Sequence, residues 1–400
     1  MLTVWVSDRR VGRIGPMGRG MSFVYDAGIS PADAVSLTMP VRMASYDSGF
    51  GLLPVFDTNL PEGFLRARIE QALAKRIGKV GPLDILALTG GNQIGRLRVL
   101  PDGQGPEQEH AGPEEIAALL SRPISPDLVS DMLDRFALRS GVSGVMPKVL
   151  ARLSDRVAGQ GGRLTLQDED WILKFESPEY PGLAAVEYWC LEVARRAGLP
   201  ATEARLSDDG RLLAVRRFDG APGARLGFED FCSLNAKPAR EKYDGSVETA
   251  LLRRMAEFSR PAERDSNLRA LYLLNAVNMG LRNGDAHLKN FALLYPDADQ
   301  GPFQLAPAFD LVTTRAWLEN DVPALTLEGK KLWPDRAALL RLAGRARLGR
   351  VQATTLLAEV AEAICGTLEE MRADLTARGF ALVAERAAEA WRDGVESLET

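Results

Sequence analysis

The sequence Arg282-Asn283-Gly284-Asp285-Ala286-His287-Leu288-Lys289-Asn290-Phe291 joins two segments of different periodicity. Before it, Leu268 to Leu281 is an apolar run with helical spacing, and after it Phe291 to Tyr295 is a short β-like run. Asp285 and Asn290 are therefore expected on a turn between two ordered elements. Such a turn suits chemistry, because loops held by a rigid scaffold commonly carry catalytic groups.

The spacing inside this turn is that of a protein-kinase catalytic loop. In that loop an Asp takes the proton of the substrate hydroxyl, and an Asn five residues later holds a magnesium ion. A further carboxylate, Asp310 in the run Leu305 to Asp310, could supply another metal ligand. The spacing alone is a weak signal, because Asn, Gly and Asp are also the usual turn residues.

Three features upstream add to this signal. The small-residue loop Ser140 to Lys148 would let backbone N–H groups approach a phosphate, although a plain hairpin turn explains it equally well. Lys174, in the predicted strand Trp171 to Phe175, is either a phosphate-binding lysine or a solvated edge-strand lysine. Glu187, on a predicted helix from Leu183, would be the glutamate that holds such a lysine.

The order of these features is the strongest argument from the residues. The features follow one another in the order that a kinase requires. That order is the small-residue loop, the strand lysine, the helix glutamate, a connector strand at Arg211 to Phe218, a helical region from Asp230 and finally the Asp285 turn. Independent accidents rarely produce that order on suitable elements.

The amino-terminal 60 residues are predicted to be β-rich. A hairpin turn is expected at Arg9 to Gly12 and a strand at Ser22 to Asp26. Four glycines at positions 12, 15, 18 and 20 are interpreted as turn glycines, because no βα crossover follows them. A helix is expected from Phe64 to Ile77.

The predicted fold class is α+β, with a β-rich amino-terminal region, a kinase-like small lobe with antiparallel strands and a mostly helical carboxy-terminal lobe. The expected domain boundaries are 1–112, 113–220 and 221–400. Residues 101–113 mark a surface loop or a linker, and one helix is predicted from Pro113 to Phe136.

Composition excludes several classes of protein. The 400 residues are 46% hydrophobic, which is ample for packed cores, and the net charge of -5 argues against a protein that coats nucleic acid. No signal peptide is visible, and no apolar run approaches the ~18 to 20 residues that span a membrane. A cytoplasmic protein with no membrane partner is expected.

Cysteine and histidine are scarce. Cys190, Cys232 and Cys365 are expected to be buried thiols, because they lack metal-ligand spacing. His110 is expected in a solvated loop, and His287 is expected to brace the Asp285 turn. With only two histidines, a histidine-based zinc site or a serine-histidine hydrolase is not expected.

The chain resembles the HipA-like serine/threonine kinases, the toxin component of bacterial toxin–antitoxin modules. The segments that carry the resemblance are Phe56 to Gly63, Gly144 to Lys148, Glu187-Tyr188, Arg217 to Asp219, Glu229 to Cys232, Asn283 to Phe291 and Leu305 to Asp310. Together they span nearly the whole chain and are far more specific than the kinase spacing.

The resemblance implies a role for each residue of the catalytic loop. Asp285 would be the catalytic base, while Asn290 and Asp310 would hold Mg²⁺ against the phosphates of ATP. Lys174 would contact these phosphates, and Lys289 would lie near the γ-phosphate.

It also implies contacts for the nucleotide. The residues that would cover the phosphates are Val142, Ser143, Gly144 and Lys148. The backbone of Arg216 to Phe218 would meet adenine, and Asp219 would reach the ribose. Arg216 departs from the glutamate expected at the hinge, which leaves the adenine contact to the backbone.

Members of this family phosphorylate a serine in the phosphate-covering loop and thereby switch themselves off. Alignment on Gly144 and Lys148 places Gly141 where many relatives have that serine. We therefore predict Ser143 first and Ser140 second as the autophosphorylated residue.

The resemblance implies two partners, a HipB-like DNA-binding antitoxin and a protein substrate such as an aminoacyl-tRNA synthetase. DNA is expected only within an antitoxin complex. The segment from Lys330 to Arg350 has seven basic residues against one acid, Asp335, and is either a solvated helix face or a contact with DNA or an acidic partner.

Two other functions stay open. The chain could be an inactive nucleotide-binding relative that acts as a partner-binding or co-repressor module, although intact Lys174, Asp285, Asn290 and Asp310 argue against it. It could also phosphorylate a small molecule, because such kinases share the same catalytic parts.

Overall fold

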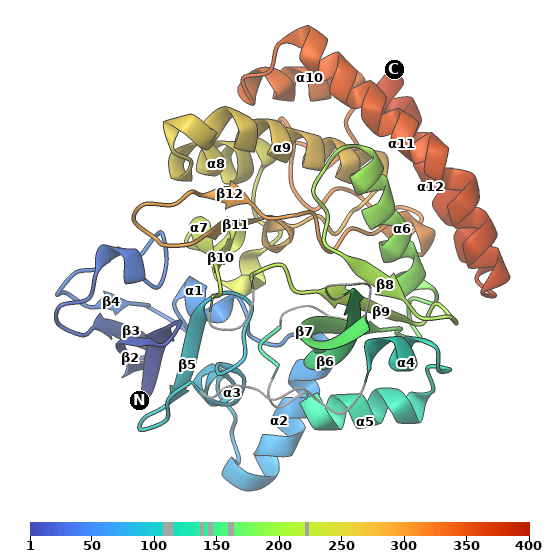
Figure 1. The fold of residues 1–400 in the computed structure, drawn as a ribbon. Helices are drawn as coiled ribbons and strands as arrows, with labels where there is room; N and C mark the ends of the chain where they lie inside the picture. The colour runs from blue at the N-terminus through green and yellow to red at the C-terminus, as the bar shows by residue number, and fades with distance from the viewer. Residues whose placement is uncertain (107–114, 137–139, 143–146, 159–163, 221–223) are drawn as a thin grey trace. The chain divides into compact units, whose positions relative to one another are not determined.

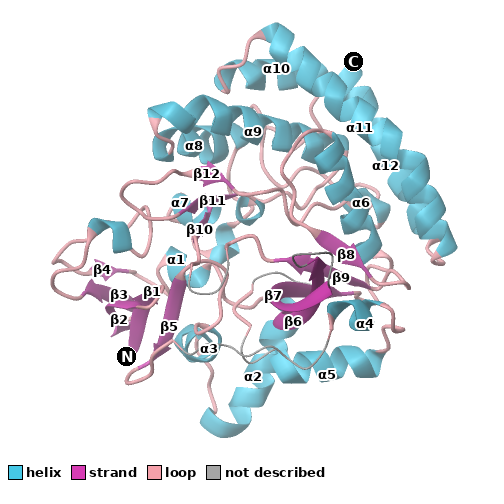
Figure 2. Cartoon of the chain, viewed as in Figure 1, coloured by secondary structure: helices cyan, strands magenta, loops and turns pink. Residues whose placement is uncertain are grey.

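A computed structural model describes residues 1–400 except 107–114, 137–139, 143–146, 159–163 and 221–223 (Figure 1). The chain divides into two compact units. Unit 1 comprises Met1–Glu176, Glu203–Glu229 and Pro296–Gly301, and unit 2 comprises Ser177–Thr202, Asp230–Tyr295 and Pro302–Thr400. Helices and antiparallel strands occur together in the fold (Figure 2), which confirms the predicted α+β class.

Unit 1 contains a five-stranded antiparallel sheet in the order β4-β3-β2-β1-β5. The strands are β1 (Leu2–Val6), β2 (Arg9–Met17), β3 (Gly20–Tyr25), β4 (Tyr46–Asp47) and β5 (Leu97–Pro101). Val4, Phe23 and Val99 are fully buried, as alternation along a half-buried strand requires. The predicted β-rich amino-terminal region is confirmed.

Two details of that prediction are wrong. The turn between β1 and β2 lies at residues 7–8, ahead of the predicted turn at Arg9 to Gly12, and Arg9 is already paired with β1. Of the four glycines only Gly18 lies in a turn, with φ of 61°. Gly12 is needed for close strand packing, because a β-carbon there would lie 2.3 Å from the carbonyl oxygen of Val24.

The α-helices described in unit 1 are α1 (Pro54–Asp57), α2 (Gly63–Ile77), α3 (Pro82–Thr89), α4 (Ile116–Leu120) and α5 (Pro126–Phe136). Helix α2 confirms the prediction for Phe64 to Ile77. The prediction of one helix from Pro113 to Phe136 is wrong, because α4 and α5 are separated by a segment that contains Pro123. Proline lacks the backbone N–H and its ring clashes with the preceding turn, so the helix breaks there.

A second antiparallel sheet in unit 1 has the order β6-β7-β9-β8. Its strands are β6 (Lys148–Ala158), β7 (Leu164–Phe175), β8 (Ala204–Leu206) and β9 (Leu212–Arg216). Trp171, Leu173 and Phe175 of β7 are fully buried, so these alternate residues face the core. The predicted strand lysine, Lys174, projects from the opposite face of β7.

Unit 2 is mostly helical, as predicted. Its helices are α6 (Leu183–Arg196), α7 (Phe231–Leu234), α8 (Arg254–Phe258), α9 (Pro261–Gly280), α10 (Arg336–Arg345), α11 (Arg350–Ala377) and α12 (Ala381–Glu399). The long helix α11 packs against α6, α9 and α12. Strands β11 (Ala292–Tyr295) and β12 (Gln304–Leu305) pair antiparallel, and β10 (Gly227–Asp230) lies at the boundary of the two units.

The cysteines only partly match the prediction. Cys190 and Cys232 are buried, whereas Cys365 on α11 is exposed, and all three are free thiols. His110 lies outside the described residues. Within the described ranges, no helix has both the length and the apolar content needed to cross a bilayer.

Candidate active site

Helix α9 packs against α12 and leads into the predicted catalytic loop, residues 282–291. A β-carbon on Gly394 of α12 would lie 1.7 Å from the carbonyl oxygen of Gly280, so the two helices touch backbone to backbone. Arg282 then leaves the helix with φ of 54°, and its buried guanidinium donates to the Asp393 carbonyl oxygen at 2.6 Å and to Ser397 Oγ at 2.7 Å. The loop therefore begins from a fixed point.

Gly284 allows the loop to pass close to a neighbouring segment. A β-carbon there would lie 1.9 Å from Asp321 Oδ2 and 2.8 Å from the Val322 carbonyl oxygen. The Gly284 N–H donates to Thr314 Oγ1 at 2.8 Å, and this hydroxyl donates in turn to the Arg282 carbonyl oxygen. Glycine is required here for space, because none of the other side chains fits.

Asp285 lies at the centre of the loop with its two carboxylate oxygens in different surroundings. Oδ1 accepts a hydrogen bond from the Tyr243 hydroxyl at 2.6 Å, while Oδ2 accepts none from any residue that the structure describes. Burial raises the pKa of the Asp285 carboxyl; the Tyr243 hydrogen bond opposes the rise, and the negative charge of Asp310 adds to it. A partly buried carboxylate with one oxygen available and a raised pKa suits a general base.

Asn290 and Asp310 lie together, as predicted. Asn290 Nδ2 is 3.1 Å from Asp310 Oδ2, and Asn290 Oδ1 accepts the His287 N–H at 3.1 Å. Asp310 has φ of 56°, a conformation rare outside glycine and often found at functional sites.

The donor chemistry of this pair fits Mg²⁺. That ion takes few protein ligands, all oxygen, and completes its shell with water and substrate phosphates. Asp310 offers a carboxylate, and the Asn290 carbonyl oxygen has a second lone pair besides the one used by His287. In the described part of the chain, no cluster of three or more His, Cys, Asp or Glu side chains forms a metal centre.

His287 and Lys289 flank these residues and are both buried. The His287 ring stacks edge to face on Tyr243, with ring centroids 5.1 Å apart. Its predicted bracing role therefore matches its place in the structure. Lys289 lies in a short 3-10 turn, Leu288–Asn290, and its predicted contact with a γ-phosphate stays a prediction.

Unit 1 brings together two other predicted residues, Lys148 and Lys174. They are directly opposite in the β6–β7 register, and each is only 5% exposed. Opposite residues of an antiparallel pair project from the same face, so two ammonium groups are concentrated there. Such a pair suits a polyanion such as a triphosphate. Glu187 belongs to unit 2, where it is buried on α6.

The start of the phosphate-covering loop is a packed structure. Ser140 is fully buried; its Oγ donates to the Phe136 carbonyl oxygen at 2.7 Å and accepts the Leu150 N–H at 2.9 Å. This hydroxyl joins α5 to β6, so Ser140 is structural here and the prediction of Ser140 as a phosphate acceptor is not supported. Val142 is also buried, whereas Ser143 and Gly144 lie outside the described residues.

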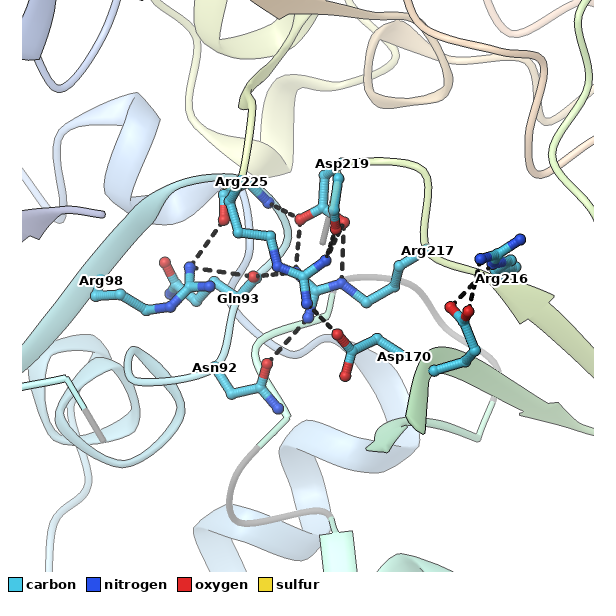
Figure 3. Close-up of polar contacts among 11 residues, drawn as sticks. Asn92, Gln93, Arg98, Asp170, Arg216, Arg217, Asp219 and Arg225 are labelled. Carbon is cyan, nitrogen blue, oxygen red and sulfur yellow. Dashed lines mark hydrogen bonds and ion pairs between the residues drawn. The ribbon is translucent and has the colours of Figure 1, made fainter. Parts of the chain in front are cut away.

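The predicted hinge, Arg216 to Phe218, is tied to the amino-terminal sheet region through Arg217. Its guanidinium donates to the Gln93 carbonyl oxygen at 2.7 Å, to Asn92 Oδ1 at 3.1 Å and to Asp219 (Figure 3). Sequence reasoning assigned no role to Asn92 and Gln93, which lie more than 120 residues away in the chain.

Asp219 does not have the surroundings of a ribose ligand. Its side chain is 1% exposed, and it accepts hydrogen bonds from Arg217 at 2.6 Å and from the Gly95 N–H at 2.7 Å, with Arg225 3.4 Å away. A ribose hydroxyl would have to displace these partners. Asp219 therefore braces the hinge, and the predicted ribose contact is not supported (Figure 3). Arg216 is exposed and forms ion pairs with Glu169 and Glu203.

Known proteins match almost the whole chain. Two family models match, the HipA N-terminal domain over residues 2–100 and the HipA-like C-terminal domain over residues 140–370. "Putative kinase Y4dM" of Sinorhizobium fredii is 30% identical over 319 residues, which cover 74% of this chain and 71% of that protein. "Putative kinase Y4mE" of the same organism is 29% identical over 413 residues, with 92% of each chain covered.

A solved structure shares the fold. It is a chain from the complex of the Shewanella oneidensis MR-1 toxin–antitoxin proteins HipA and HipB with operator DNA. The TM-score is 0.65 and the sequence identity is 17%, and the match covers 99% of this chain and 97% of that chain. The fold and the family matches define a kinase. The chain belongs to the HipA-like kinase family, as its sequence motifs indicated.

Proposed function

We propose that the chain is an ATP- and Mg²⁺-dependent serine/threonine protein kinase of the HipA toxin type. The observation that supports this most is the state of Asp285, which has one carboxylate oxygen held by Tyr243 and the other without a hydrogen bond from the described residues. Asn290 and Asp310 lie together, with Asn290 Nδ2 3.1 Å from Asp310 Oδ2, and their side chains offer the oxygen ligands that Mg²⁺ prefers.

In the proposed reaction, the hydroxyl of a serine or threonine donates a hydrogen bond to Asp285 Oδ2. Its oxygen attacks the γ-phosphorus of ATP, the bond to the β-phosphate oxygen breaks, and the proton passes to Asp285. Lys148 and Lys174 neutralise phosphate charge in the nucleotide complex. Bound Mg²⁺, held by Asn290 and Asp310, would neutralise the charge that develops on the phosphate oxygens. Positioning and charge supply most of the acceleration.

We also propose self-regulation through Ser143 in the phosphate-covering loop. A phosphate adds about -1.5 to -2 charges, which would repel the phosphates of a bound nucleotide. Ser140 is the weaker candidate, because its buried hydroxyl would have to leave two hydrogen bonds and the core.

The proposed partners are a HipB-like DNA-binding antitoxin and a cellular protein substrate, such as an aminoacyl-tRNA synthetase. The support for the antitoxin is the HipA complex with HipB and operator DNA whose fold this chain shares. The basic segment from Lys330 to Arg350 is largely exposed, but Arg341 already pairs with Glu328. DNA contact is therefore proposed only within the antitoxin complex.

The test is intact-mass spectrometry after incubation with ATP and Mg²⁺. Wild type should gain about 80 Da per phosphate, with the site mapped to Ser143, and Asp285→Asn should gain none in the time that wild type takes to gain one phosphate. The matched control is Asp265→Asn, the same change at an exposed carboxylate of unit 2, which should behave as wild type.

Other results would favour the alternatives. Nucleotide binding with neither mass gain nor ATP turnover would support an inactive partner-binding module. ATP turnover that needs a small alcohol and leaves every protein mass unchanged would support a small-molecule kinase.

A further inference from the structure

Tyr243 is a residue near the catalytic base to which the sequence motifs assigned no role. Its hydroxyl donates to Asp285 Oδ1 at 2.6 Å across 42 residues of sequence, while Tyr243 as a residue is 42% exposed. A tyrosine hydroxyl bonded to an ionised carboxylate is a short, charge-assisted hydrogen bond, stronger than a bond between neutral groups. The contact therefore fixes the orientation of the carboxylate.

The segment that carries Tyr243 is itself held by the catalytic loop. The Leu288 N–H donates to the Lys242 carbonyl oxygen at 3.0 Å, and the His287 ring packs against the Tyr243 ring. On the other side, the Thr326 N–H donates to the Gly245 carbonyl oxygen at 3.1 Å. Backbone bonds thus fix the segment on both sides of Tyr243, and the phenol is not a loosely placed surface side chain.

We propose that Tyr243 is a positioning residue for phosphotransfer: it holds Asp285 through Oδ1 so that Oδ2 alone is presented to the acceptor hydroxyl. The inference rests on the proposed kinase function and adds to it the choice of the oxygen that takes the proton. A base must lie within hydrogen-bond reach of the proton it removes, so an unrestrained carboxylate would lose rate through misorientation.

Two other roles for the same contact lead to different results. If the phenol occupied the place of the acceptor hydroxyl and inhibited the enzyme, its removal would speed the reaction. If the phenol were itself an acceptor, phosphate would appear on Tyr243. The proposed role predicts neither result.

The experiment compares wild type with Tyr243→Phe, which removes only the hydroxyl and keeps the ring contact with His287. The kcat for phosphotransfer should fall at least about tenfold. The KM for ATP and the affinity for ATP should stay within about twofold, since in the proposed reaction Asp285 meets the acceptor hydroxyl. Tyr180→Phe, whose ring packs on Trp317 in the same unit, is the matched control and should keep the wild-type kcat.

A double-mutant cycle separates positioning from a general structural role. In an Asp285→Asn background, Tyr243→Phe should cause no further loss, because its effect acts through the carboxylate. An equal loss in both backgrounds, a faster enzyme or phosphate on Tyr243 would overturn the inference. Absence of phosphotransfer by wild type would instead refute the proposed function, so the two failures are distinguishable.

Discussion

Asp219 and Asp285 are the same residue type in two opposite environments. Asp219 is enclosed in unit 1 by Arg217, Arg225 and the Gly95 N–H; burial alone would raise the pKa of its carboxyl, but the arginines and hydrogen bonds together lower it. Asp285, in unit 2, has one hydrogen bond to its side chain from the described residues, and its pKa is raised by burial.

Under the proposed function, this difference separates a structural carboxylate from a reactive one. A carboxylate whose oxygens are all engaged stabilises the fold and cannot take a proton from a ligand without breaking its contacts. A carboxylate whose charged form is disfavoured, and which keeps one oxygen available, can act as a base. The family resemblance assigned both aspartates to the nucleotide site, Asp285 as the base and Asp219 at the ribose. The surroundings of Asp219 instead engage its carboxylate oxygens with Arg217 and the Gly95 N–H.

The largest effect on stability is expected for Asp219→Asn. The change removes the carboxylate that pairs with buried Arg217, whereas Arg225 keeps its ion pair with Asp170. Breaking a buried ion pair by removing one partner costs about 3 to 5 kcal/mol of unfolding free energy. Urea unfolding measures this loss of unfolding free energy, with Asp265→Asn as the control. A variant as stable as wild type would show that the buried pair does not brace the hinge.

Gly284→Ala should cause the next largest loss of stability. The new methyl group would overlap Asp321 and the Val322 carbonyl oxygen, so the loop must shift, at a cost of about 1 to 3 kcal/mol. Because Asp285 follows directly, phosphotransfer should be lost as well. Gly349→Ala, where a β-carbon meets nothing within 4 Å, is the control and should leave activity unchanged.

Ser140→Ala tests the packed start of the phosphate-covering loop. It leaves the Leu150 N–H without its acceptor, which should cost about 1 to 3 kcal/mol. Self-phosphorylation, followed by intact mass under conditions where the variant is folded, should persist, since the proposed acceptor is Ser143. Loss of the added phosphate in this variant alone, with full activity on a protein substrate, would assign the site to Ser140.

The smallest effects should be in pH dependence. Asp219 has a lowered pKa when folded, so its stabilisation is present above the ordinary aspartate pKa and is lost as the pH falls through the folded value. Asp285 has a raised pKa, so the acid limb of kcat should lie above the ordinary aspartate value, and Tyr243→Phe should move it higher still. A limb that does not move in Tyr243→Phe would argue against the hydrogen bond.

The sequence predicted the local part of this account. The joint role of Asn290 and Asp310, 20 residues apart, was implied by the family resemblance. The helix before the predicted catalytic loop, the strand after it and the strand lysine follow from periodicity. These features depend on neighbouring residues, so a local pattern contains them.

Contacts between residues far apart in the sequence could not be predicted from local patterns. Asn92 and Gln93 meet Arg217 across more than 120 residues, and nothing in the local sequence shows that Asp219 will be enclosed. Ser140 was expected in a small-residue loop, because small polar residues next to glycine are common in turns. Only the fold shows that its hydroxyl joins α5 to β6.

The most direct test of the central claim is a single-turnover measurement of phosphotransfer by wild type, Asp285→Asn and Asp219→Asn at a temperature where all three are folded. We expect Asp285→Asn to lose about 100- to 10,000-fold in rate, because an amide cannot take the proton of the acceptor hydroxyl. Its stability and nucleotide affinity should stay at the wild-type level, because burial disfavours the charged form of Asp285 and a neutral amide removes no favourable charge. Asp219→Asn should keep its rate within about tenfold while it unfolds at lower denaturant. A fast Asp285→Asn, or an Asp219→Asn that is stable yet inactive, would contradict the assignment of the two aspartates.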